Sequence, residues 1–248
     1  MTIAVVTWKE VDAALSTVID PELDEPITDL GFVTERVVTG GDVLVRLRLP
    51  TAFCSPSFAY LMASDAEDAI ARLPGVASVR VLLDDHHDSD RINAGVAARN
   101  GFVAAYPREA AGELDELRKV FQVKAHAAYI ERACTVMLRE YGWEVADLGR
   151  LTFGDLPTEG VREGLGRRRS ALGLDTSTDS LVMVDADGTA WPADRIELRL
   201  RFAKAIRISI DGNAHFCRGL LRTRYPESAA DQRARAQDAT PHERVEAS

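Results

Sequence analysis

The sequence predicts an α+β protein with two domains, and three observations support this prediction. The 248 residues, of which 46% are hydrophobic, suffice for one large core or two smaller ones. Helical spacing of apolar residues in some segments and alternation in others predict both helices and strands. The stretch AAYPREAAGE at residues 104–113 has the Ala, Pro and Gly content of a linker. We therefore expect a two-layer domain over residues 1–107, a helix-rich α+β accessory domain over 108–226 and a disordered tail over 227–248.

The N-terminal domain is expected to open with a helix and a hairpin. Thr7 and Glu10 have the spacing of a capping box, and the apolar residues that follow repeat with a helical period. Residues 33–38 and 43–49 have the two-residue period of strands and flank the turn TGGD. The sequence therefore predicts a helix followed by two antiparallel strands.

A second helix and a third strand complete a helix-hairpin-helix-strand unit. Ser55 suits the N-cap of a helix and Pro56 its first residue, and residues 58–73 carry apolar side chains at helical spacing. The tripeptide PGV ends this helix, and residues 79–83 alternate like a strand before the polar run DDHHDSDR. One small sheet with helices packed on it is the expected result.

The second domain is expected to be mostly helical. Residues 114–141 predict a long helix closed by Gly142, and residues 159–172 a further helix. A short hairpin should turn at Asp187-Gly188. Residues 193–205 predict a helix, although the alternation of their apolar residues also allows a strand. After them we expect a strand at IRISI, a turn at DGN and a closing helix at AHFCRGLLRTRY.

Charge and composition exclude several classes of protein. The net charge of −9 argues against nucleic acid as the main partner, since phosphate binding needs a concentrated basic surface and RRR at residues 167–169 is too short to supply one. The sequence has no run of roughly 18 apolar residues and no basic flank near its N-terminus, which predicts a cytoplasmic protein that does not bind membranes. Three widely spaced cysteines without a CxxC motif indicate reduced thiols.

Cys54 is the first candidate for chemistry. It lies just before a predicted helix, where the positive end of the helix dipole favours the thiolate that binds soft metals or attacks a substrate. The alternative is a small buried hydrophobic residue, and its position alone does not decide between them. A papain-like site would need His86 or His87 beside Cys54, but the run that contains them is typical of a solvated loop.

Other candidate ligands are weaker. The acidic stretch DPELDEPITDLGF lacks the spacing of a calcium loop, and Asp20 and Asp29 can instead bind backbone amides while Gly31 takes positive φ. His215 and Cys217 would face the same side of an extended segment and could chelate one ion, but in a helix they would diverge. His126 and Cys134, eight residues apart, would lie roughly 12 Å apart along a helix, too far to share a metal.

The N-terminal motifs resemble a known family. The sequence has DPE at residues 20–22, DLG at 29–31, and Thr51 followed by Cys54 before a helix. In this order, over about the first 100 residues, they resemble the metal-sulfur (iron-sulfur) cluster assembly factor family, which includes SufT-like and PaaD-like proteins. The resemblance implies that Cys54, Thr51, Asp20, Glu22 and Asp29 handle the cofactor, which would be iron or an iron-sulfur cluster. The second domain resembles no family that we recognise.

The resemblance implies a maturation factor and not an enzyme. Such a protein would bind a client iron protein or the assembly machinery, and PaaD-like relatives suggest a multicomponent iron oxygenase as the client. Two alternatives remain open at this point: an adaptor or chaperone in which Cys54 is structural, and a cysteine-dependent enzyme. In the metal-binding interpretation Cys54, His215 and Cys217 are the candidate ligands. One cysteine leaves a cluster short of ligands, so a homodimer or borrowed ligands would be required.

Overall fold

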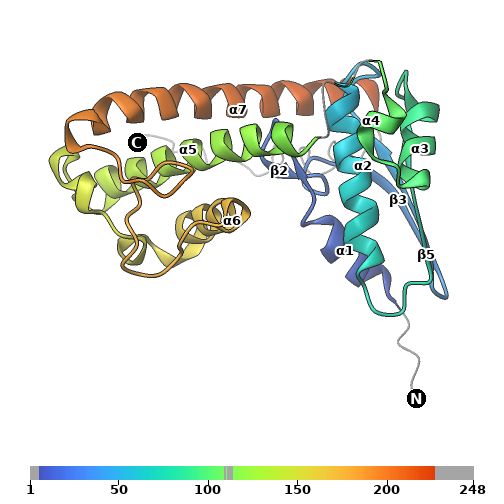
Figure 1. Ribbon diagram of the computed structural model, residues 1–248, viewed down its shortest axis with the longest axis horizontal. Helices are drawn as coiled ribbons and strands as arrows, with labels where there is room; N and C mark the ends of the chain where they lie inside the picture. The colour runs from blue at the N-terminus through green and yellow to red at the C-terminus, as the bar shows by residue number, and fades with distance from the viewer. Residues whose placement is uncertain (1–5, 109, 111–113, 227–248) are drawn as a thin grey trace, which may run out of the picture. The chain divides into compact units, whose positions relative to one another are not determined.

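The structure is a computed structural model that describes residues 6–108, 110 and 114–226. The chain divides into two compact units, residues 1–114 with 214–248 and residues 115–213. The expected α+β class is confirmed, because helices are combined with a small sheet in the first unit and dominate the second (Figure 1). The first unit takes in residues 214–226, which the sequence assigned to the accessory domain. The predicted tail at 227–248 lies outside the described residues.

The first unit begins as the sequence predicts. Helix α1, Trp8–Leu15, starts at a capping box in which Thr7 and Glu10 bond each other reciprocally. Two short strands, β1 (Ile19–Asp20) and β2 (Glu25–Pro26), pair across the acidic stretch. The predicted hairpin follows as β3 (Val33–Thr39) and β4 (Asp42–Arg48).

The rest of the first unit completes the helix-hairpin-helix-strand order. Helix α2, Pro56–Ala71, crosses to β5, Ser78–Asp84, which pairs in parallel with β4, so that the sheet order is β3-β4-β5. Helices α3, Ser89–Ala98, and α4, Gly101–Ala105, follow. Because β4 and β5 are parallel neighbours, the segments that follow them, 49–55 and 85–88, leave the sheet at the same edge.

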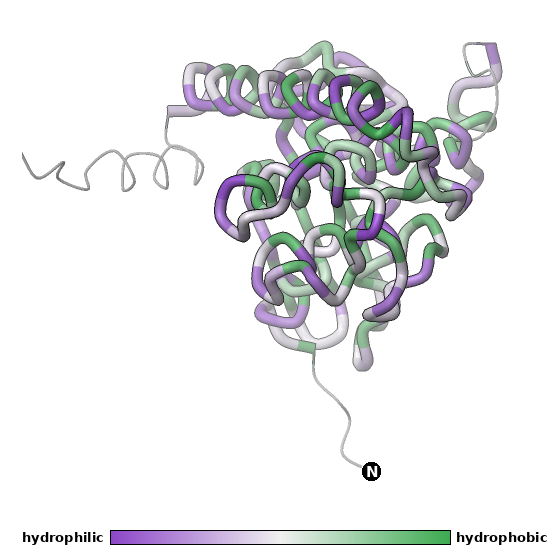
Figure 2. Tube along the Cα trace, turned by 90° about the vertical axis from the view of Figure 1, so that its left-hand side faces the viewer, coloured by the Kyte–Doolittle hydropathy of each residue, from purple (hydrophilic) through white to green (hydrophobic). Residues whose placement is uncertain are grey.

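One face of the sheet forms the core of the first unit. The side chains of Val43, Val45 and Leu47 in β4 are buried and alternate with partly exposed residues, which is the pattern of a sheet covered on one side. Helices α1, α2 and α3 pack against the sheet and one another. Along the helices hydrophobic and hydrophilic residues alternate, as expected where one side is buried (Figure 2).

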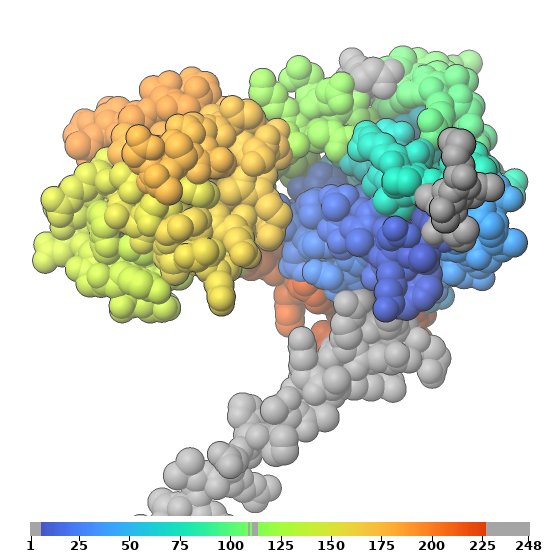
Figure 3. All heavy atoms as spheres, turned by 90° about the horizontal axis from the view of Figure 1, so that it is seen from below, coloured from blue at the N-terminus to red at the C-terminus, as the bar shows by residue number. Residues whose placement is uncertain are grey.

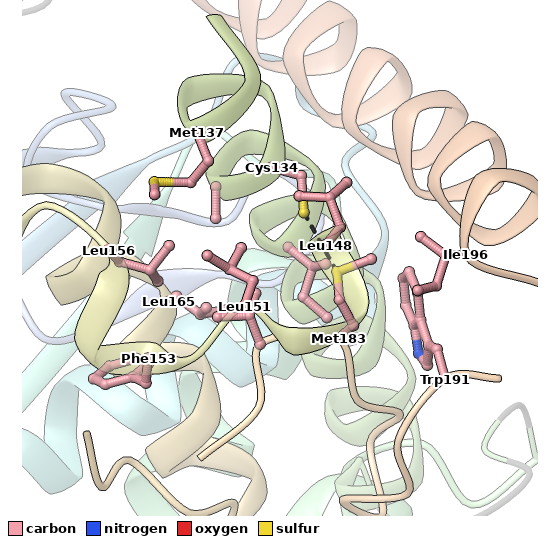
Figure 4. Close-up of a cluster of buried hydrophobic side chains, with 13 residues drawn as sticks. Cys134, Met137, Leu148, Leu151, Phe153, Leu156, Leu165, Met183, Trp191 and Ile196 are labelled. Carbon is pink, nitrogen blue, oxygen red and sulfur yellow. Dashed lines mark hydrogen bonds between the residues drawn. The ribbon is translucent and has the colours of Figure 1, made fainter. Parts of the chain in front are cut away.

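The second unit is built on helices. Its regular elements are α5 (Asp115–Glu140), η1 (Val145–Arg150), η2 (Phe153–Asp155), η3 (Thr158–Arg162), α6 (Glu163–Leu172), η4 (Ala193–Arg195) and the first part of α7 (Ile196–Arg224). The predicted long helix is confirmed as α5, and Gly142 has the left-handed φ of 71° that its cap position requires. Thirteen buried residues, among them Cys134, Met183 and Trp191, form the core (Figure 4).

Buried Arg169 organises the irregular segment after α6. Its guanidinium donates to the carbonyls of Asp175, Leu181 and Val182 and to the hydroxyl of Ser180. These bonds fix residues 175–182, which form no regular strand. The hairpin predicted around Asp187-Gly188 is present only as a turn flanked by the isolated bridge Val184–Ala190.

The C-terminal elements are where the sequence prediction is wrong. Residues 196–224 form the single helix α7, so IRISI is not a strand, DGN is not a turn, and the strand alternative for residues 193–205 is excluded. The buried residues Ile196, Ala203, Ala214 and Leu221 are spaced by 7, 11 and 7. These spacings are close to whole numbers of turns, and they put all four residues on one face.

Among the helices of the described residues, none combines the length and the apolar content that crossing a membrane requires.

Candidate functional site

Cys54 lies on a short loop between β4 and α2. Its thiol is partly exposed, and the Thr51 hydroxyl contacts Cys54 Sγ at 3.7 Å. The same hydroxyl oxygen accepts the N–H of Phe53 at 3.0 Å. Helix α2 begins at Pro56 as predicted, although the Ser55 hydroxyl pairs with Ser57 and makes no capping bond. Thr51 therefore shapes the loop and touches the thiol.

His86 supports the Cys54 loop from the neighbouring strand. Its Nε2 donates to the Cys54 carbonyl at 2.8 Å, and its Nδ1 accepts the Asp88 N–H at 3.1 Å. A carbonyl only accepts and an amide only donates, so these two bonds fix the neutral Nε2–H tautomer. Burial, which leaves the residue 5% exposed, lowers the pKa of His86 and keeps the ring neutral. Both ring nitrogens are used, so His86 is a support and has no nitrogen left to act as a base for the thiol.

His87 adds a second support. Its backbone N–H and its ring Nδ1 both donate to the Ala52 carbonyl, at 3.0 and 2.9 Å. The ring also lies against that of Phe53, with centroids 5.5 Å apart. The expectation that DDHHD is only a solvated loop is therefore wrong. The missing information was the parallel pairing of β4 and β5, which local patterns do not reveal.

The acidic stretch is a compact hairpin, with β1 and β2 paired at its base. Asp20 Oδ1 accepts the N–H groups of Glu22 and Leu23, each at 2.9 Å, and Gly31 has the positive φ expected of it. Asp20 is only 6% exposed, and desolvation raises its pKa to about 6 in spite of those two bonds. Asp29 is exposed, and its Oδ1 accepts the Thr28 hydroxyl at 3.3 Å.

Cys217 comes to this site from the far end of the sequence. It lies on the last part of α7, within the first unit, and is partly buried. Burial raises its pKa to about 11, and the charges of Cys54, Asp20 and Glu22 add to the rise. These groups are therefore near enough to act on one another electrostatically.

The predicted pairing of His215 with Cys217 does not form. Both residues are in helix α7, where positions two apart point about 160° away from each other, and His215 is exposed. The chelate depended on an extended backbone that this segment does not have.

Cys134 and His126 belong to the other unit and are buried. The Cys134 thiol donates to Met183 Sδ at 3.3 Å, and desolvation raises its pKa to about 12 (Figure 4). Burial lowers the pKa of His126 to about 4. Cys134 is thus a core residue, which makes it a useful internal control for Cys54.

The first unit is therefore an α+β module that holds a partly exposed thiol on a braced loop. Residues 9–82 match the family model described as "Iron-sulfur cluster assembly protein". This segment is similar to that family, as its motifs predict, and the second unit lies outside the match.

Curated relatives agree with this assignment. An "Iron-sulfur cluster carrier protein" of Mycobacterium leprae is 42% identical over 82 residues, which cover 33% of this chain and 21% of the relative. The protein of the same name from Mycobacterium tuberculosis H37Rv is 41% identical over 80 residues, covering 32% and 20%. This chain thus spans about a fifth of the length of these relatives.

Proposed function

We propose that this chain carries an iron-sulfur cluster, or iron destined for one, on the Cys54 loop and delivers it to a client protein or to the assembly machinery. The observation that carries the proposal is the partly exposed Cys54 on a loop held by Thr51, His86 and His87, in a segment that matches an iron-sulfur cluster assembly family. The names of the relatives support the same cargo.

The ligand supply favours transfer over permanent storage. Among the described residues there is no group of three or more His, Cys, Asp or Glu side chains that could enclose a metal ion. Clusters of the common types take four cysteine ligands. The remaining ligands would therefore come from a second copy of this chain or from the client, and a cargo with open positions can move to a protein that fills them.

An enzymatic role for Cys54 has less support. A nucleophilic cysteine needs a base within hydrogen-bond reach of its sulfur. His86 and His87 instead direct ring nitrogens to the backbone carbonyls of Cys54 and Ala52. The carrier role therefore accounts for both histidines, as parts that hold the loop.

An adaptor is the second candidate function, because Phe53 beside Cys54 is 80% exposed. A large exposed aromatic side chain suits the centre of a protein interface. In this case the chain would bind its client without carrying metal, and Cys54→Ala would keep full maturation activity.

A multicomponent iron oxygenase as the client stays a prediction that rests on the motif resemblance alone. It predicts that a strain lacking this chain accumulates the oxygenase with too little iron. Full iron content of the oxygenase in that strain would remove it as the client.

Anaerobic reconstitution with iron and sulfide tests the carrier proposal. Iron and sulfide content and the absorption spectrum should show a bound cluster in the wild type and in the control variant Cys134→Ala, whose cysteine is buried in the other unit. Cys54→Ala should lose most of the bound iron. Absence of stoichiometric iron from the wild type would contradict the carrier and favour the adaptor.

A further inference from the structure

The last turns of α7 present one side to the first unit. Ala214 and Leu221 are buried, whereas His215, Phe216 and Thr223 are exposed. Cys217 and Arg218 lie between the two buried positions on the same helical face. In Figure 3 the orange-red end of α7 is visible beside the blue segments of the first unit. The helix therefore turns Cys217 toward the module that carries Cys54.

An ion pair attaches this helix to the acidic hairpin. Arg218 Nη2 contacts the carboxylate of Glu25, and Glu25 pairs with Asp20 across β1 and β2. Burial and the neighbouring Arg222 lower the pKa of Arg218, but a guanidinium keeps its charge at any physiological pH. Cys217 is the residue next to this attachment.

A second attachment holds the helix to the loop that supports Cys54. Arg224 Nη2 donates to the Asp85 carbonyl at 2.7 Å, and the Tyr225 hydroxyl donates to Asp85 Oδ2 at 3.1 Å. The Arg48 guanidinium lies over the Tyr225 ring, with its Cζ 3.8 Å from the ring centroid. Asp85 directly precedes His86, which bonds the Cys54 carbonyl. The helix is therefore fixed both to the acidic hairpin and to the segment whose His86 supports the Cys54 loop.

We propose that Cys54 and Cys217 together form a two-thiolate site for iron, so that the C-terminal helix completes the cargo site of the N-terminal module. This inference deepens the proposed function and rests on it. As the metal binds, each thiol gives its proton to solvent and its sulfur bonds the metal, with no change in oxidation state. Two thiolates are half of the ligands of a four-cysteine cluster, and the other half stays open to a partner.

The structure supports this pairing independently of cluster chemistry. Both attachments lie on the part of the helix that directly follows Cys217, at Arg218 and at Arg224, and they hold this part of the helix on the first unit, which also contains Cys54. The third cysteine, Cys134, lies in the other unit and bonds Met183. A reagent that needs two neighbouring thiols should therefore select Cys54 and Cys217.

Dibromobimane, which becomes fluorescent when it has alkylated two nearby thiols, tests the proximity without any metal. The reduced full-length chain and Cys134→Ala should become fluorescent, whereas Cys54→Ala and Cys217→Ser should not. Equal fluorescence from Cys217→Ser and the wild type would overturn the proposed pair. Circular dichroism checks that Cys217→Ser, which keeps the size of the side chain, is folded.

Co²⁺ tests the metal site itself, because the intensity of its thiolate charge-transfer band rises with the number of bound sulfurs. In Cys217→Ser the band should fall to about half of the wild-type intensity, since one of two thiolates is lost. His215→Ala, on the exposed side of the same helix, should leave the band unchanged. An unchanged band in Cys217→Ser would contradict the proposal.

The two proposals fail in different ways. If Cys217→Ser keeps the full iron and sulfide content while Cys54→Ala loses it, the carrier stands and the two-thiolate site falls. If the wild type takes up no cluster in reconstitution, the carrier itself fails, whatever dibromobimane reports.

Discussion

Replacing Asp20 by Asn should stabilise the protein at neutral pH. Asp20 is almost fully buried, and desolvation raises its pKa from 3.8 to about 6. At pH 7 the native state must therefore hold a buried carboxylate whose charge the unfolded chain hydrates freely. Asn has the same shape and an Oδ1 that can still accept the N–H groups of Glu22 and Leu23. The substitution removes the buried charge and can keep the turn.

The expected magnitude follows from the difference between the folded and unfolded pKa values. A rise from 3.8 to about 6 is about 2 pK units, and at about 1.4 kcal/mol per unit this amounts to roughly 3 kcal/mol. Because the folded pKa of Asp20 is the higher one, the contribution of this residue to the free energy of unfolding is fully present below pH 3.8. It is lost as the pH rises through about 6. Asp20→Asn should thus gain up to about 3 kcal/mol at pH 7 and nothing near pH 3.8.

Urea unfolding of the wild type and of Asp20→Asn at pH 7 and near pH 4, followed by circular dichroism, measures this gain. His86 and His126 also have shifted pKa values, but they are present in both proteins and cancel in the difference. Asp29→Asn is the matched control, because it removes the same charge from an exposed position of the same stretch. A gain of similar size at both pH values, or one equalled by Asp29→Asn, would refute the reasoning.

Three further predictions follow from the supports of the site and the core. His86→Ala removes the bond to the Cys54 carbonyl, so the loop should move more freely and iodoacetamide should alkylate Cys54 several-fold faster; an unchanged rate would show that His86 does not hold the loop. Arg169→Met removes the four hydrogen bonds of the buried guanidinium and should lower the free energy of unfolding of the second unit by at least about 2 kcal/mol, measured by Trp fluorescence in urea; a loss below about 0.5 kcal/mol would contradict this role. Because burial raises the pKa of Cys217 to about 11, Co²⁺ must displace its proton, and the Co²⁺ affinity measured by titration should rise from pH 7 to pH 9. In Cys217→Ser the affinity should rise less with pH, and an equal rise in both proteins would contradict Cys217 as a ligand.

The N-terminal module could be predicted because local signals determine its elements. The capping box of Thr7 and Glu10 places α1, and Pro56 places the start of α2. The strands have a clear two-residue period, and the turn TGGD joins the first two. Each of these signals lies within a few residues of the element that it defines.

Helix α7 could not be predicted in the same way. Its middle carries Ile206, Ile208 and Ile210 at alternate positions, which is typical of a strand. The helical face becomes visible only over the whole stretch from Ile196 to Leu221. A short segment of this sequence therefore favours the two-residue period of a strand over the period of a helix. The predicted pairing of His215 and Cys217 depended on that strand-like backbone.

The assembly of the site depends on contacts that no local pattern specifies. His86 reaches Cys54 because β5 pairs in parallel with β4. The helix that carries Cys217 is attached to the first unit because Arg218 and Arg224 bond Glu25 and Asp85, more than 130 residues earlier in the chain. The sequence identified Cys54 and Cys217 as candidates one at a time. Only the tertiary structure brings them into one unit.

Transfer of the cluster tests the central claim most directly. The reconstituted chain is mixed anaerobically with an apo-ferredoxin that accepts a [2Fe–2S] cluster, in the presence of an iron chelator, and the circular dichroism of the acceptor is followed over time. The account predicts that the ferredoxin signal appears in spite of the chelator with the wild type and not with Cys54→Ala. Transfer at the same rate from both proteins, or no transfer from a fully loaded wild type, would contradict it.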